Sequence, residues 1–187
     1  MREECCVEES GGFTLVIRDT EASIYAPVEI ESSSAAILCE HLRAAPSTYQ
    51  VNFYLGGCVG GCCFTGQKII SAMNSCAANI TCYADAPVQS MASLIALSGD
   101  KLYLLPNSFL MFHNYSTDYS GKGASILAGV YHNHKFLITQ SDTICYPFLT
   151  QKELKLLKKD TDIFIHWDDK TLEDRFTRHF VGDNDDE

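Results

Sequence analysis

The chain has 187 residues, of which 46% are hydrophobic and 20% are charged, and its formal net charge is −10 at pH 7. This length and composition predict one globular domain with a sizeable core. The negative charge argues against a nucleic-acid-binding protein, which needs a basic face. No apolar run is long enough to cross a membrane.

The acidic residues are concentrated at the two ends of the chain. Residues 1–10 and 181–187 together supply −7 of the net charge, so the body between them is nearly neutral. Segments that are highly charged and poor in apolar residues stay solvated. We therefore expect a single domain over residues 1–187, with flexible acidic tails over 1–12 and 181–187.

The chain has nine cysteines, and its first residues lack the apolar stretch of a secretion signal. An odd number of cysteines in a chain of this size favours reduced thiols and a cytoplasmic location. Three of the cysteines lie in Cys58-Val59-Gly60-Gly61-Cys62-Cys63, where the spacing differs from that of a zinc site. We expect small buried thiols there and no metal or cofactor.

The order of the expected elements is that of an α/β domain, in which strands and helices alternate. Ser32, Ser33 and Ser34 are the expected caps of the first helix, which Pro46 ends. The expected strands are 14–17, 23–26, 51–55, 80–84, 101–105, 108–113 and 163–165. The expected helices are one ending at 45, then 65–77, one that Ser90 opens and that ends near 98–99, 124–145, 150–158 and 171–180.

Three residues are candidates for the catalytic triad of a serine hydrolase. They are, in chain order, Ser90, which opens an apolar helix, His113, which ends an apolar strand, and Asp160. A serine nucleophile needs a base, a group that orients the base, and donors for the oxyanion. At the first turn of a helix the N–H of Met91 is free to be one such donor. The glycine turn at Gly60-Gly61 would supply the second donor, because a residue without Cβ lets the backbone approach a substrate.

Each of these residues also has a structural interpretation. Ser90 is in a position where a serine commonly caps a helix. His113 fits a core or edge histidine, and Asp160 fits the cap of whatever follows the preceding helix. Asp162, two residues later, is a rival for the role of Asp160.

Read together, these segments resemble the ClpP family, the proteolytic subunits of the Clp protease. The resemblance rests on Gly60-Gly61 after a strand, Gln89-Ser90-Met91-Ala92, Lys159-Asp160-Thr161 and, above all, Leu105-Pro106-Asn107-Ser108 with Met111-Phe112-His113. It covers roughly residues 22–169. The fold that it implies is a β-α-β spiral core shared with the crotonases, from which a long handle helix near 124–145 protrudes.

The resemblance also implies roles for residues of this chain. Ser90 would be the nucleophile, His113 the general base, Asp160 its orienting carboxylate, and the amides of Gly61 (or Gly60) and Met91 the oxyanion hole. The implied activity is a serine endopeptidase that cleaves unfolded polypeptides through an acyl-enzyme. Such enzymes form homo-oligomers of stacked rings, heptameric in this family, and an AAA+ unfoldase is the implied ATP-consuming partner.

Two departures from the family pattern surround the nucleophile. Gln89 stands where the family has a small residue, and Ala92 replaces a glycine. These departures indicate a divergent member, for which a viral origin, acting in host cytoplasm, is one hypothesis. Two alternatives therefore stay open: a catalytically inactive structural subunit of the same fold, and a crotonase-type acyl-CoA enzyme.

Overall fold

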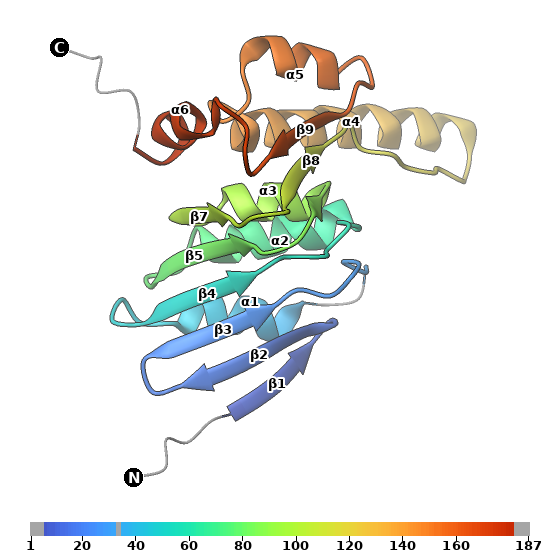
Figure 1. Ribbon diagram of the computed structural model, residues 1–187. Helices are drawn as coiled ribbons and strands as arrows, with labels where there is room; N and C mark the ends of the chain where they lie inside the picture. Colours follow the sequence, from blue (N-terminus) through green and yellow to red (C-terminus); the bar gives the residue numbers. More distant parts are fainter. Residues whose placement is uncertain (1–5, 33–34, 182–187) are drawn as a thin grey trace, which may run out of the picture.

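The computed structural model describes residues 6–32 and 35–181, and these residues form two sheets and a set of surrounding helices (Figure 1). The strands are β1 Cys6–Ser10, β2 Phe13–Arg18, β3 Glu21–Tyr25, β4 Gln50–Tyr54, β5 Asn79–Ala84, β6 Val88–Gln89, β7 Lys101–Leu104, β8 Phe109–Phe112 and β9 Ile163–His166. The helices are α1 Ala36–Ala44, α2 Cys63–Met73, α3 Met91–Leu97, α4 Gly123–Cys145, α5 Gln151–Leu157, α6 Leu172–Phe176 and a π-helical turn, Thr177–Val181. The α/β class and the protruding long helix expected from the sequence are confirmed.

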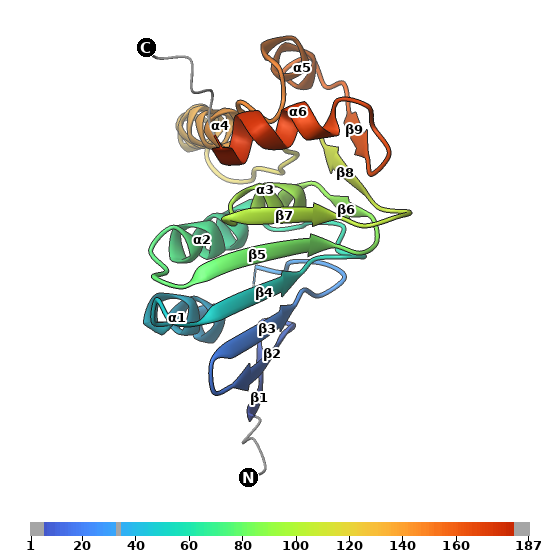
Figure 2. The same ribbon diagram turned by 60° about the vertical axis from the view of Figure 1, so that its left-hand side comes forward.

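The larger sheet has six strands in the order β1-β2-β3-β4-β5-β7. Strands β1, β2 and β3 are antiparallel, whereas β3, β4, β5 and β7 run parallel and are joined through α1, α2 and α3. Successive side chains of a strand point to opposite faces. One face therefore buries Ile24, Phe53 and Cys82 in the main core, and α1 and α2 lie side by side along the sheet (Figures 1 and 2).

The other face of this sheet carries a row of tyrosines on four neighbouring strands. The rings of Tyr25, Tyr54, Tyr83 and Tyr103 are stacked, with centroids 4.9, 4.9 and 5.5 Å apart along the row. Cross-strand aromatic pairs of this kind stabilise strand register.

The second sheet has three strands in the order β6-β8-β9 and lies beyond the β7 end of the first sheet (Figure 2). β6 pairs with β8 in parallel, and β8 pairs with β9 in the antiparallel sense. The turn at Pro106 and Asn107 therefore joins two sheets, because β7 belongs to the first and β8 to the second. The parallel pairing brings Ser90, just after β6, next to the end of β8.

Three sequence-based expectations about the ends of elements are wrong. Residues 6–12 are not a flexible tail, because Cys6–Ser10 pairs along its whole length with β2, and the acidic side chains of Glu8 and Glu9 have partners in His41 and Thr14. Helix α1 has Ala35 as its N-cap, without a side-chain cap. The expected helix over 171–180 ends its α-helical turns at Phe176 and continues as a π-helical turn.

Other expectations fall on positions outside the described residues. These are the first five residues of the N-terminal tail, the caps Ser33 and Ser34, and the acidic segment 182–187.

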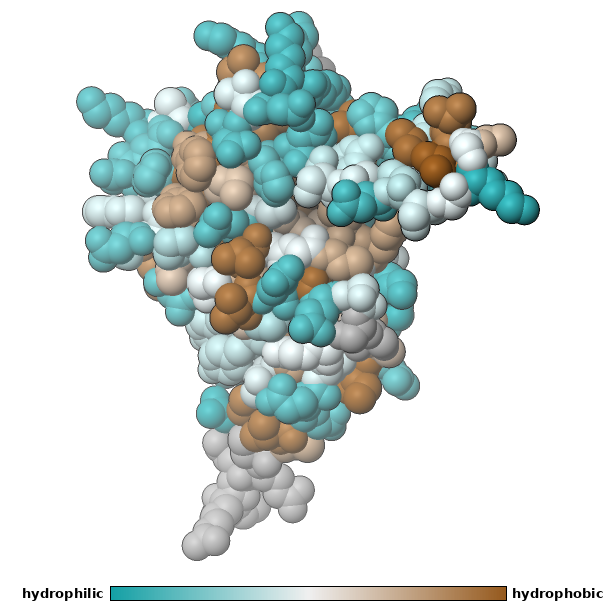
Figure 3. Space-filling model, turned by 90° about the vertical axis from the view of Figure 1, so that its right-hand side faces the viewer, coloured by the Kyte–Doolittle hydropathy of each residue, from teal (hydrophilic) through white to brown (hydrophobic). Residues whose placement is uncertain are grey.

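Helix α4 stands out because it is long and little buried. Of its 23 residues only Leu137 and Cys145 are buried, and its N-terminal end projects past both sheets (Figure 1). Several large apolar side chains are exposed along it, among them Leu127, Val130, Tyr131 and Phe136. In the surface view of Figure 3, apolar residues form separate patches among hydrophilic ones. No helix in the described part of the chain is long and apolar enough to cross a membrane.

Candidate active site

Ser90 occupies a strained backbone position between β6 and α3. Its φ is 56° and its ψ is −127°, a conformation that residues other than glycine rarely adopt. The strand pairing holds it there, because the N–H of Ser90 donates to the carbonyl of Met111 at 2.8 Å and the N–H of Gln89 donates to that of Cys58 at 3.0 Å.

Ser90 and His113 are in hydrogen-bonding contact. The Oγ of Ser90 lies 2.6 Å from Nε2 of His113. Ser90 is the N-cap residue of α3, but its side chain makes no capping hydrogen bond. The interpretation of the Ser90 side chain as a helix cap is therefore wrong. Its hydroxyl is hydrogen-bonded to His113, which the sequence analysis predicted as its base.

The carboxylate of Asp160 is hydrogen-bonded to Asn114, the residue after His113 in the chain. The Nδ2 of Asn114 donates to Oδ1 of Asp160 at 2.9 Å, and within the described residues no hydrogen bond joins Asp160 to His113. Asp160 lies in the turn that follows α5, whose C-cap is Lys158. Its φ is 57°, and its N–H donates to the carbonyl of Leu157 at 2.9 Å. Asp162 is exposed.

The glycine turn packs directly against the serine. A methyl group at Gly60 would lie 2.6 Å from Cβ of Ser90 and 2.9 Å from the backbone nitrogen of Met91. Only a residue without Cβ allows this approach, and Gly60 also has φ 93°. Gly61 forms a parallel β-bridge with Ile30. The two backbones approach so closely there that a Cβ at Gly61 would clash with the carbonyl oxygen of Ile30.

Of the two expected oxyanion donors, Met91 directly follows Ser90, and Gly61 follows Gly60, the glycine that approaches Ser90. Met91 is the first residue of α3 and is buried, so its N–H has no partner inside the helix. Throughout the described ranges, no hydrogen bond is recorded from the N–H of Met91 or of Gly61.

Two residues that the sequence did not single out hold this arrangement together. The hydroxyl of Ser93, which is fully buried, lies 3.0 Å from the carbonyl of Val88 and 2.9 Å from that of Met111. It thus ties both strands next to Ser90 to helix α3. Asn114 is the second, because it is the partner of Asp160.

The flanking residues Gln89 and Ala92 differ in where they lie. Gln89 is in β6 and is partly buried, whereas Ala92 is fully buried inside α3. Ala92 therefore packs into the core, and the hydroxyl of Ser90 reaches His113 with both residues in place.

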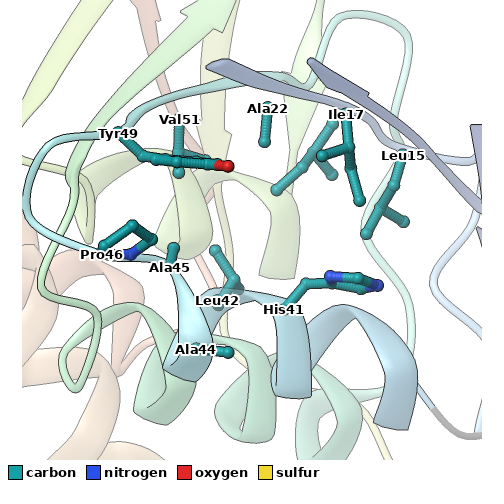
Figure 4. Close-up of a pocket in the computed structure, with 11 residues that line it drawn as sticks. Leu15, Ile17, Ala22, His41, Leu42, Ala44, Ala45, Pro46, Tyr49 and Val51 are labelled. Atoms are coloured by element: carbon teal, nitrogen blue, oxygen red, sulfur yellow. The ribbon is translucent and has the colours of Figure 1, made fainter. Parts of the chain in front are cut away.

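A pocket away from Ser90 and His113 lies between α1 and strands β2 to β4 (Figure 4). Its volume is about 220 Å³. Side chains from the strands face side chains from α1 across it, and the lining is apolar apart from His41 and Tyr49. It has no serine or cysteine nucleophile, so it does not compete with the Ser90 site. Over the described residues, no group of three or more His, Cys, Asp or Glu side chains is arranged to hold a metal ion.

Comparison with known proteins agrees with the resemblance stated for the sequence. The family model described as Clp protease matches residues 14–163. This range includes all of β3 to α5 and most of β2, together with Ser90, His113 and Asp160. No curated protein matches the chain. The family match covers most of the chain, and this chain belongs to the Clp protease family.

Proposed function

We propose that this chain is a serine endopeptidase that cleaves unfolded polypeptides through an acyl-enzyme. The observation that carries the proposal is the 2.6 Å contact between Oγ of Ser90 and Nε2 of His113, at a serine whose backbone is strained. Strain of this kind costs about 1–3 kcal/mol and is concentrated at functional sites. The family membership supports the same class of reaction.

In the proposed reaction, His113 removes the proton from Ser90 as the hydroxyl oxygen attacks the scissile carbonyl. The negative charge that develops on the carbonyl oxygen is stabilised by the N–H groups of Met91 and Gly61. His113 then gives the proton to the leaving amine, and the C–N bond breaks to leave an ester on Ser90. Water, deprotonated by His113, hydrolyses the ester and restores the serine.

Asp160 is assigned to orient His113 and to stabilise its imidazolium form. In the structure its carboxylate is bonded to Asn114, the neighbour of His113. Catalytic hydrogen bonds are often loose before substrate binds, so we propose that Asp160 moves from Asn114 to His113 on substrate binding or assembly.

The exposed helix α4 supports a homo-oligomer. An isolated surface helix is stabilised mainly by burial of one face, yet only Leu137 and Cys145 of α4 are buried in a single chain. Exposed apolar side chains along a helix are typical of an interface. We propose that α4 docks copies of this chain into stacked rings, with a separate AAA+ unfoldase as partner. The cysteines of the described residues form no disulfide, which fits a reducing compartment such as the cytoplasm.

The test of this function is cleavage of a permanently unfolded polypeptide by the purified, assembled chain. We expect cleavage by the wild-type protein and none by Ser90→Ala or His113→Ala. If the wild-type and Ser90→Ala proteins cleave at the same rate, a contaminant or another residue is responsible and the proposal is wrong.

A second candidate is a subunit of the same rings that does not catalyse. The observation that favours it is the Asn114–Asp160 hydrogen bond, which leaves His113 without its expected carboxylate partner. This candidate predicts rings that assemble through α4 and cleave nothing, so the cleavage assay separates it from the peptidase.

A further inference from the structure

A small cavity, open on one side, borders Ser90 and His113 and is walled by three helices. Its volume is about 30 Å³. Its walls come from α2, α3 and α4 and from the residues just after β8, and they are formed by Cys63, Gln67, Met91, Leu94, Leu137 and Ser141 together with Tyr115.

The walls of this cavity are fixed by packing. Leu94 and Leu137 are buried. The side chain of Met91 lies directly over Gly66, where a methyl group would be 2.2 Å from its Cγ, so it has no room to withdraw toward α2. Burial raises the pKa of the Cys63 thiol, which therefore lines the cavity as a neutral group.

The position of the cavity determines which part of a substrate it receives. In the acyl-enzyme the carbonyl carbon is bonded to Oγ of Ser90, so the side chain nearest to the cavity belongs to the residue before the scissile bond. A single water needs about 10–15 Å³ of such space. The cavity thus holds about two waters, which matches a side chain of one or two heavy atoms.

We infer that this subsite selects small residues, namely alanine or serine, immediately before the scissile bond. The inference rests on the proposed peptidase function and names the substrate class of that site. Leu137 and Gln67 are the specificity-determining residues, because they close the cavity from α4 and from α2.

The test compares fluorogenic peptides that are identical except for the residue before the cleaved amide. All peptides share one leaving group, so only this side chain varies. We expect kcat/KM to be at least about 10-fold higher for alanine than for leucine or phenylalanine, because one surplus methylene in a tight pocket costs about 10- to 200-fold.

Enlarging the cavity should reverse this preference. Leu137→Ala removes one wall, and Gln67→Ala removes another without emptying the core. Either variant should raise kcat/KM for the leucine peptide relative to the alanine peptide by about 10-fold. The control is Val7→Ala, on β1, at a side chain that is 60% exposed and belongs neither to the cavity nor to α4, and it should leave the ratio unchanged.

The outcomes separate this inference from the function on which it rests. If the peptides are hydrolysed in a Ser90-dependent way but leucine is accepted as well as alanine, the inference is wrong and the peptidase stands. If Leu137→Ala and Gln67→Ala both keep the wild-type ratio, these walls do not set specificity. If no peptide is hydrolysed by the assembled protein, the proposed function fails and the inference fails with it.

Discussion

A 2.6 Å hydrogen bond joins the hydroxyl of Ser90 to the imidazole of His113, although the two residues are 23 positions apart in the chain. The parallel pairing of β6 with β8 creates this relationship, because each residue directly follows one of the two paired strands. The same pairing places the N–H of Ser90 on the carbonyl of Met111. The geometry of the site is therefore a property of the small sheet.

The first prediction concerns the stability of Ser90→Ala. Loss of a capping side chain usually costs about 1 kcal/mol, but Ser90 makes no capping hydrogen bond. We expect the free energy of unfolding, measured with urea, to change by less than about 0.5 kcal/mol. Thr150→Ala is the matched control, because Thr150 forms a complete capping box with Glu153 and should lose about 1 kcal/mol. An equal loss in both variants would restore the cap interpretation of Ser90.

The second prediction concerns the close approach of Gly60 to Ser90. Gly60→Ala places a methyl group 2.6 Å from Cβ of Ser90, and we expect it to abolish the reaction of Ser90 with an active-site serine reagent. Gly57→Ala is the control, since Gly57 has a similar φ of 82° but has nothing within 4 Å of the added methyl. It should lose about 1 kcal/mol of stability or more from backbone strain and keep its reactivity. Full reactivity of Gly60→Ala would show that the turn does not shape the site.

The third prediction assigns the carboxylate partner of His113. Asp160→Asn should lower kcat by about 10²- to 10⁴-fold, because a histidine without its carboxylate adopts the wrong tautomer and loses charge stabilisation. Asp162→Asn, a substitution of the same kind at an exposed position, should stay within about twofold of the wild type. Steady-state kinetics with one peptide substrate measures both. The assignment is reversed if Asp162→Asn is the variant that loses activity.

The fourth prediction concerns the ion pair that anchors α6 to α5. Nη2 of Arg175 lies 2.8 Å from Oε1 of Glu153, and its Nη1 donates to Oε2 of the same residue at 3.0 Å and to the carbonyl of Phe148 at 3.0 Å. Burial alone would raise the pKa of Glu153, but the hydrogen bonds from Arg175 and Thr150 outweigh it and lower this pKa to about 2.

This lowered pKa sets the sign of the pH dependence. The carboxylate is bound more favourably in the folded state, so its contribution is complete above the ordinary pKa of 4.5 and is lost as the pH falls toward 2. A shift of this size corresponds to about 3 kcal/mol. Glu153→Gln should therefore be less stable than the wild type at pH 6, and the difference should shrink by pH 3 in urea unfolding. Glu173→Gln, at an exposed position of α6, should show no such convergence; a constant difference for Glu153→Gln would contradict the account.

The sequence predicted the elements around the site because local signals mark them. Apolar runs and the turn residues at Gly60, Gly61 and Pro106 placed Ser90 at the start of a helix and His113 at the end of a strand, and the structure has them next to α3 and β8. Strand β6, which directly precedes Ser90, was not expected, because it has only two residues. Their contact could not follow from periodicity alone, since it depends on which strands pair. The resemblance to a known family supplied that step.

Other features had no local signal. Ser93 looks like any serine in a short helix, and its two carbonyl partners come from β6 and β8, which are far apart in sequence. The bond from Asn114 to Asp160 likewise spans 46 residues. Strand β1 was missed because its acidic composition is typical of a solvated tail, whereas in the fold Glu8 and Glu9 have partners on α1 and β2.

The central claim is that Ser90 is a nucleophile activated by His113, and covalent labelling tests it most directly. The assembled wild-type protein is treated with a fluorophosphonate, and the modified residue is mapped by mass spectrometry. The account predicts one adduct, on Ser90, that is absent from His113→Ala. A folded, assembled protein in which Ser90 stays unmodified, or in which His113→Ala is labelled as fast as the wild type, would contradict it.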